Sequence, residues 1–271
     1  MLRGLFLGLL VLAGASCGGG GGGGGGGSNP PPQFPSSQAN LTSANAQSYA
    51  TSVDLAARMA ATLRLGQFLT STATPGTLTD PGCRAIGAGA ATINVTPPTG
   101  SVTGTASYSN FDQCFGIRLT GTANVNGTLV GTQVDSLNLT FSNVTFTTTG
   151  GGPSYQMSGS ASLQYMSGGS GSSSYVMTVN ATVSGGASFK LDGFRIDSAF
   201  AAGLENLFIS GRLTLADGFV DITPTASRVE LPIPSTGLQN GTVQLTGATT
   251  IATAFFNGGT VPPSIISIVP R

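Results

Sequence analysis

Apolar and polar residues alternate with a period of two over long stretches of this chain. The alternation is clearest in residues 115–125, 155–165 and 175–183, where odd-numbered positions are mostly apolar and even-numbered ones mostly Ser, Thr, Asn or Gln. Successive side chains of a β-strand point to opposite faces of its sheet. The pattern therefore predicts antiparallel strands with one face on a core and the other in water.

Four Asn-Gly or Asp-Gly dipeptides lie between strand-like runs, and such dipeptides favour two-residue hairpin turns. They are Asn126-Gly127, Asp192-Gly193, Asp217-Gly218 and Asn240-Gly241. A turn at the second dipeptide would pair Leu191 with Phe194, and a turn at the third would pair Leu215 with Val220. The apolar positions change from odd to even near Ser142-Asn143. This change predicts a β-bulge.

The runs correspond to about 11–13 strands, most of them joined to their neighbours in sequence. Flat open sheets of this size are unusual. We therefore predict an all-β fold with one N-terminal helix, in which an antiparallel meander forms a curved sheet or an open barrel. A two-sheet β-sandwich is the alternative. Residues 155–165 and 175–183 are expected to pair as neighbours, because a Gly/Ser-rich segment joins them.

Residues from about 43 to 65 form the one strong helix candidate. Thr42 can cap it, Asp54 and Arg58 form an i,i+4 pair in the favourable order, and Gly66 stands where a left-handed C-cap is expected. Apolar residues, most of them small, recur at helical spacing at Tyr49, Val53, Ala56, Ala60 and Leu63. The helix should therefore pack closely on the sheet.

The N-terminus reads as an export signal. Residues 1–3 are a short basic start, residues 5–13 are an apolar core, and small residues then lead into Cys17. The core is too short to span a bilayer, which takes about 20 residues. Ala15-Ser16-Cys17 resembles the lipobox of bacterial lipoproteins, in which two small residues precede a Cys that becomes the lipidated N-terminus. That family usually has Leu three residues before the Cys, and this chain has Gly14 there.

Plain secretion is the alternative, because Ala13-Gly14-Ala15 fits the small-x-small cleavage site of an ordinary secretory signal. The cysteine count favours the lipoprotein. The chain has three cysteines, and lipidation of Cys17 would leave Cys83 and Cys114 as a pair in an oxidising compartment. A bond between them would close a loop of about 32 residues and contribute roughly 4 kcal/mol in the chain-entropy model.

A spacer follows the signal. Residues 18–27 are ten consecutive Gly, and a Pro run follows at 30–32. On coil scaling, residues 18–37 span roughly 25 Å. The expected organisation is an export signal in residues 1–16, a lipidated Cys and tether in 17–37, a helix in 38–70 and an antiparallel β domain in 71–271. The residue after Cys17 is Gly, where lipoproteins retained in the inner membrane usually carry Asp, so the resemblance implies the outer membrane, facing the periplasm or the cell surface.

Composition excludes several function classes. Only 7% of the residues are charged, the net charge is zero and there is no His. Balanced charge argues against nucleic-acid binding, which takes clustered Lys and Arg. Without His the chain lacks the commonest general base and the commonest transition-metal ligand. We therefore expect a non-enzymatic protein with no cofactor, no metal and no nucleic-acid partner.

Two function classes remain. The first is a structural or surface-interaction lipoprotein, held at the membrane by its lipid, whose polar face or loops meet an envelope protein. The alternative is a module that binds an apolar, lipid-like ligand on the apolar face of a curved sheet. The same face would instead be a filled core under the first reading. Its residues include Tyr155, Met157, Leu163, Tyr165, Tyr175, Met177 and Val179.

Overall fold

The structure is a computed structural model, and the chain divides into two compact units, residues 1–31 and 32–271. All described residues belong to the second unit. They are residues 33–63, 70–71, 77–80, 90–95, 101–130, 133–149, 151–165, 172–183, 187–201, 204–232, 237–258 and 262–271. The expected export signal, Cys17 and the Gly run lie outside this part of the chain. Gly66, the expected C-cap, also lies outside it.

One helix, α1 (Ser43–Thr62), precedes all the strands. The first eight strands are β1 (Thr70–Ser71), β2 (Thr77–Asp80), β3 (Ala90–Val95), β4 (Ser101–Asp112), β5 (Ile117–Val130), β6 (Gln133–Thr148), β7 (Ser154–Tyr165) and β8 (Ser172–Thr182). The others are β9 (Phe189–Ala201), β10 (Leu204–Leu215), β11 (Gly218–Pro224), β12 (Val229–Pro232), β13 (Gln239–Thr246), β14 (Thr250–Asn257) and β15 (Ser264–Pro270).

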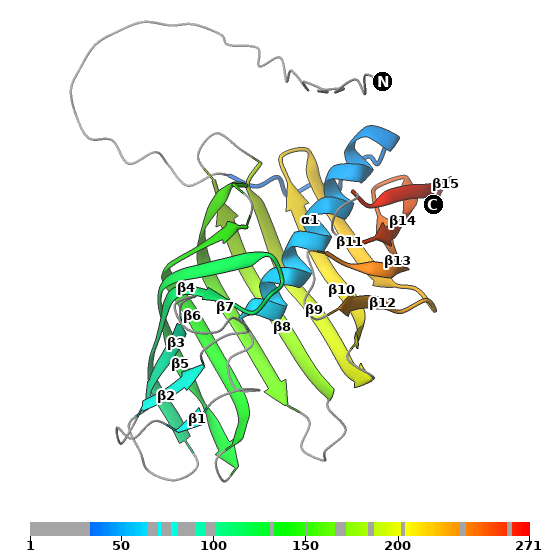
Figure 1. Ribbon diagram of the computed structural model, residues 1–271. Helices are drawn as coiled ribbons and strands as arrows, with labels where there is room; N and C mark the ends of the chain where they lie inside the picture. Colours follow the sequence, from blue (N-terminus) through cyan, green and yellow to red (C-terminus); the bar gives the residue numbers. More distant parts are fainter. Residues whose placement is uncertain are drawn as a thin grey trace, which may run out of the picture. The chain divides into compact units, whose positions relative to one another are not determined.

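These strands form one antiparallel sheet, with its two ends at β1 and β15 (Figure 1). Each strand pairs with its neighbour in sequence, except that β12 lies off the path and pairs with both β10 and β13. Among the described residues β1, β2 and β12 have four residues or fewer, which leaves twelve longer strands. The predicted meander with one N-terminal helix is therefore confirmed, and the single sheet replaces the alternative of a sandwich.

Helix α1 begins where the sequence predicts. The Thr42 hydroxyl accepts the backbone N–H of Asn45, and the Asn45 side chain accepts the backbone N–H of Thr42, which makes a capping box. Arg58 and Asp54 form the expected i,i+4 ion pair, with 2.9 Å between Nε and Oδ2. The five residues of the predicted stripe are all buried.

The sheet curves around α1, because the helix contacts strands as far apart as β5 and β15 (Figure 1). Bulges and glycines produce this curvature. Gly121 in β5 and Gly159 in β7 both have a φ near +120°, which other residues rarely adopt. A Cβ on either would overlap a backbone carbonyl oxygen of the next strand, that of Asn143 or Thr178. Glycine is therefore required where these strands bend.

The predicted register holds in the middle of the sheet. Strands β7 and β8 pair as expected, with Leu163 opposite Tyr175. The predicted bulge is also present, because Thr122 and Ala123 pair with Asn143 and Phe141 and leave Ser142 without a partner. The inward side chains of β4–β14 and the buried side of α1 together form one hydrophobic core.

Three of the four predicted turns are wrong. Asn126-Gly127 lies inside β5, Asp192-Gly193 inside β9 and Asn240-Gly241 inside β13. The second and third of these stand at irregularities of strand pairing, and a residue with positive φ serves a bulge as well as a turn. Only the turn near Asp217-Gly218 exists, and there Leu215 pairs with Gly218, so the register differs from the predicted one by two residues.

Candidate functional site

The apolar face predicted from the alternation lies in the core. Its members Tyr155, Met157, Leu163, Tyr175, Met177 and Val179 are all buried, the most exposed of them being Tyr155 at 8%. The seventh, Tyr165, pairs through its backbone with Ser173, and its side chain is outside the described part of the structure.

The C-terminal half of α1 lies against this face. Ala60 and Leu63 of the helix region line a small hollow together with Leu163, Tyr175 and Met177 of the sheet. The hollow has a volume of about 10 Å³, which is room for about one water molecule. The described side chains therefore leave little space between Ala60 and Leu63 and these three residues of the sheet.

An aromatic cluster adjoins the same face. The rings of Phe146 and Tyr155 stack with their centroids 4.7 Å apart, and Phe189 packs at a tilt against both. Burial raises the pKa of the Tyr155 hydroxyl above its usual range. Such arrangements are typical of stabilising aromatic contacts in a core.

The outward face of β4–β8 is polar and carries rows without charge. Two adjacent rows cross the five strands, each made of residues that are directly opposite one another. The first row is Thr105, Asn124, Thr140, Ser160 and Thr178, and the second is Thr103, Asn126, Asn138, Ser162 and Val176. We call these ten positions the neutral face.

Part of the neutral face is hollowed. A depression of about 530 Å³ lies over β4–β6 and is lined by Thr103, Asn124, Asn126, Asn138 and Thr140 together with the backbone around them. This volume is in the range of small-ligand and peptide sites. The three Asn side chains are exposed, and no hydrogen bond in the described part of the chain engages them. Each amide offers two donors and an acceptor, so the depression can hydrogen-bond an uncharged polar partner.

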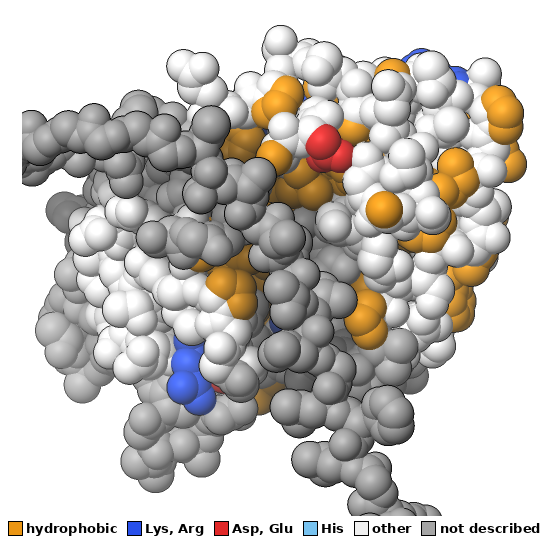
Figure 2. All heavy atoms as spheres, turned by 90° about the horizontal axis from the view of Figure 1, so that it is seen from above, with side chains coloured by type: hydrophobic (Ala, Val, Ile, Leu, Met, Phe, Trp, Pro, Cys, Tyr) orange, Lys and Arg blue, Asp and Glu red, His pale blue; other side chains and the backbone are white. Residues whose placement is uncertain are grey.

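Charged side chains gather instead on β9–β11. Three ion pairs lie there: Lys190 with Asp192, Arg195 with Asp197, and Arg212 with Asp221. All six side chains are more than a third exposed, so each pair contributes little to stability. Figure 2 shows how sparse charged side chains are on the face seen from above. The outward surface thus has a neutral face and a charged part on β9–β11, while Arg118 of β5 and Asp135 of β6 carry charge outside the ten positions of the neutral face.

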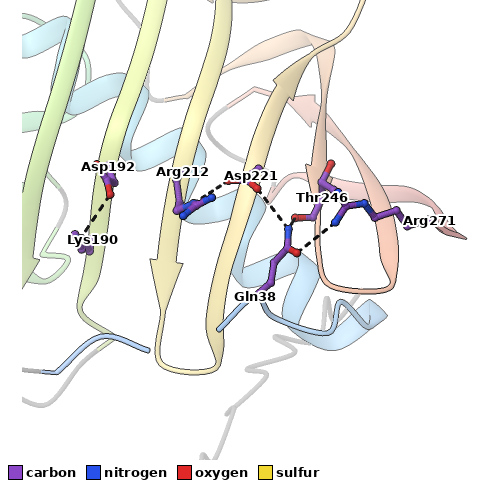
Figure 3. A network of polar contacts seen from close by, with 7 residues as sticks. All are labelled: Gln38, Lys190, Asp192, Arg212, Asp221, Thr246 and Arg271. Atoms are coloured by element: carbon purple, nitrogen blue, oxygen red, sulfur yellow. Dashed lines mark hydrogen bonds and ion pairs between the residues drawn. The ribbon is translucent and has the colours of Figure 1, made fainter. Parts of the chain in front are cut away.

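A polar network connects the segment before α1 to the charged part (Figure 3). The amide of Gln38 donates to the Thr246 carbonyl oxygen over 3.1 Å and to Asp221 over 3.4 Å. Its oxygen accepts from Arg271 over 3.3 Å. Backbone bonds join Ala39 and Ser37 to Phe219. These contacts fix the point at which the chain enters the β domain, and nothing in the sequence pattern predicted them.

The predicted cysteine pair is only half described. Cys114 lies in the β4–β5 connection with a φ of +63°, and its backbone N–H donates to the Asp112 carboxylate over 2.7 Å. Cys83 lies outside the described residues, as does Cys17, so their bonding and lipidation stay predictions. Within the described ranges no group of three or more His, Cys, Asp or Glu could hold a metal ion. No helix there is long and apolar enough to cross a membrane.

No family model, curated protein or solved structure matches this chain. The sequence showed the neutral face only as the polar half of the alternation, which is even-numbered in β5–β8 and odd-numbered in β4. Its continuous rows depend on strand register, which the sequence pattern predicts for β7 and β8 and which the structure extends to β4–β6.

Proposed function

We propose that this chain is an exported, non-enzymatic lipoprotein of the cell envelope, anchored in the outer membrane through Cys17. Its β domain has a structural or surface-interaction role and meets an envelope protein through the neutral face. The export signal, the lipobox-like residues before Cys17 and the Gly/Pro spacer support the anchor. Secretion without a lipid remains the alternative location.

One observation carries the surface role, namely the two uncharged rows across β4–β8 with the depression over β4–β6. Exposed amides and hydroxyls gain from a partner that offers complementary hydrogen bonds, and a neutral surface does not depend on the partner's charge. The burial of the described residues of the apolar face in β7 and β8 supports this role over uptake of an apolar ligand. Co-purified lipid in an organic extract of the folded domain would instead favour the apolar-ligand alternative.

Mass spectrometry of the mature N-terminus tests the anchor. We expect an acylated peptide that begins at Cys17, and we expect Cys17→Ser to release the chain from membranes. A mature peptide that begins at Ser16 and carries no acyl chain would overturn the anchor and establish secretion.

Photo-crosslinking in intact cells tests the neutral face. A photoreactive amino acid that replaces Thr140 lies in the depression, and one that replaces Thr223 lies on β11 away from it; both positions are exposed. We expect a discrete protein adduct from position 140 and none from position 223. The adduct from position 140 should disappear in Asn126→Lys/Asn138→Lys, which places two positive charges on a cross-strand pair of the neutral face. It should persist in the control Thr223→Lys/Gln244→Lys, which places two positive charges on a cross-strand pair of β11 and β13. Equal adducts from both positions would count against the neutral face.

A further inference from the structure

Strand β15 (Ser264–Pro270) ends the sheet. It pairs with β14 on one side, and no strand of the described residues pairs with its other side. An edge strand presents backbone N–H and C=O groups that can pair with another strand. Proteins usually protect such an edge with charged side chains. From Ser264 to Val269 this strand carries none. Its other protective features are its length of seven residues, Pro270 at its end and a bulge at Ile266, where the pairing with β14 shifts.

The side chains of β15 are unusually apolar for an edge. Ile266 is 60% exposed and Val269 is 48% exposed, and these are the exposed large hydrophobic residues of the described chain. Ile265 and Ile268 are partly buried and pack on the core. Apolar side chains are visible on the right-hand side of Figure 2, the side where Figure 1 places β13–β15. The edge thus offers both backbone pairing and apolar contact.

The sequence of β15 is complementary to itself. Four of the five residues from 265 to 269 are branched and apolar, and Ser267 is the fifth. An antiparallel copy of the same strand, related by a two-fold axis at Ser267, sets Ile266 of one chain opposite Ile268 of the other and Ile265 opposite Val269. No like charges meet in this arrangement, because the pairing segment has no charged residue. We propose that β15 is a homodimer interface, in which two copies of this chain join edge to edge about a two-fold axis.

The size of the edge sets the strength of this dimer. A strand of seven residues buries less surface than the roughly 1,200 Å² at the low end of stable interfaces. We therefore expect a reversible dimer that dissociates on dilution. In a two-fold dimer the free edge of each β15 is paired with that of the other chain. No free β15 edge remains to bind a third chain, so the assembly stops at two chains.

Sedimentation of the full mature chain with Cys17→Ser tests this proposal over a wide range of concentration. We expect the measured mass to rise to twice that of the monomer. Ile266→Lys/Val269→Lys should weaken self-association by on the order of tenfold or more, because the two lysines of each chain would bring uncompensated positive charge into the apolar pairing segment. Asn126→Lys/Asn138→Lys adds the same charge on the neutral face and should leave the dimer intact. Circular dichroism checks that every variant is folded.

Cysteine cross-linking tests the two-fold axis separately. Ser267→Cys places a thiol near the axis, and Ser160→Cys places one at an exposed position on β7. Under mild oxidation we expect disulfide-linked dimers from the first variant and none from the second. A chain that stays monomeric at all concentrations overturns the proposal. Species larger than dimers would also overturn it, since they require β15 to pair with a different edge.

Discussion

The carboxylate of Asp54, in the middle of α1, accepts a hydrogen bond of 2.6 Å from the backbone N–H of Leu238, 184 residues later in the chain. The same carboxylate pairs with Arg58, whose guanidinium also donates to the carbonyl oxygen of Phe115. One buried acidic group therefore connects the helix to the start of β13 and, through Arg58, to the start of β5. This contact fixes α1 across the concave side of the sheet.

Replacing Asp54 should loosen that connection. Asp54→Ala removes the acceptor for Leu238 and leaves Arg58 without its charge partner, although Arg58 is only 14% exposed. We expect a loss of about 3 kcal/mol in the free energy of unfolding, the range for a broken buried pair. Chemical denaturation measures it. Thr51→Ala on the exposed side of α1 is the control, and an equal loss there would contradict the assignment.

Asp54 also predicts a pH dependence. Burial raises the pKa of its carboxyl above the usual range, and Arg58 and the Leu238 N–H oppose that effect only in part. The folded state then holds a proton more tightly than the unfolded state. The associated stability is fully present below the usual aspartate pKa and is lost as pH rises through the folded pKa. In Asp54→Asn the free energy of unfolding should change less with pH between the usual aspartate pKa and the folded pKa of Asp54. An unchanged dependence on pH would show that Asp54 is not its cause.

Tyr49 should resist ionisation. Its hydroxyl lies 2.8 Å from the Asp217 carboxylate and 2.7 Å from the Gly218 carbonyl oxygen, and burial together with Asp217 raises its pKa. Burial also raises the pKa of Tyr108 and Tyr155. An absorbance titration should therefore show these three phenols ionising only when the domain unfolds in alkali. Tyr49→Phe should cost about 1–2 kcal/mol through the lost hydrogen bonds. Gradual ionisation of all five tyrosines before unfolding would contradict the packing.

Leu163 and Gln164 test the faces of β7. Leu163 is buried opposite Leu137 and Tyr175, and Gln164 is exposed. Leu163→Asp should unfold the domain or cost more than about 3 kcal/mol, because it buries an unpaired charge. Gln164→Asp should change stability by less than about 0.5 kcal/mol. Thermal unfolding followed by circular dichroism compares the two. A larger loss of stability in Gln164→Asp than in Leu163→Asp would show that the register of β7 differs by one residue.

Gly159 tests the origin of the curvature. Gly159→Ala places a methyl group on the Thr178 carbonyl oxygen at a φ of +117°, and we expect a loss of about 3 kcal/mol or more. Gly193 also has a positive φ, +56°, but a methyl group there would meet no atom within 4 Å. Gly193→Ala should therefore cost only about 1 kcal/mol. Equal losses in denaturant titrations would show that backbone strain, and not the close approach of two strands, dominates.

The expected bond between Cys83 and Cys114 is tested by thiol titration of the unfolded, unreduced mature chain. We expect neither cysteine to react. Replacing either should cost about 2–5 kcal/mol, the usual range for a native disulfide. Two reactive thiols from these positions would contradict the bond. Cys17→Ser serves as the background, because it removes the third cysteine without changing the β domain.

The sequence pattern predicted the strands well, because each long strand needs one continuous apolar face. The bulge near Ser142-Asn143 was readable for the same reason, since an extra residue moves every later side chain to the opposite face. The helix could be predicted from Thr42 to Leu63, because the capping residue and the helical spacing of the apolar residues indicate the same segment. These features are local, and alternation or helical spacing records them directly.

The positions of the turns and the arrangement of the outward surface could not be predicted from these local patterns. Gly193 and Asn240 adopt the positive φ that a hairpin turn requires, but the chain uses it at irregularities inside long strands. Local sequence does not distinguish the two uses, because the choice depends on the strand alongside. The neutral face and the contacts of Gln38 likewise join residues that are far apart in sequence, and only strand register brings them together.

The position of α1 has a consequence for how this chain reaches its final state. Helix α1 is synthesised before every strand of the described chain, yet it contacts β13, β14 and β15, about 200 residues later. Contacts of such long sequence separation slow folding, because a large loop must close before they form. Strands β5, β9 and β10 cover part of the apolar side of α1, and the remainder is covered only when the last strands are present. A chain with this order of elements can complete its hydrophobic core only after its last strands have been made.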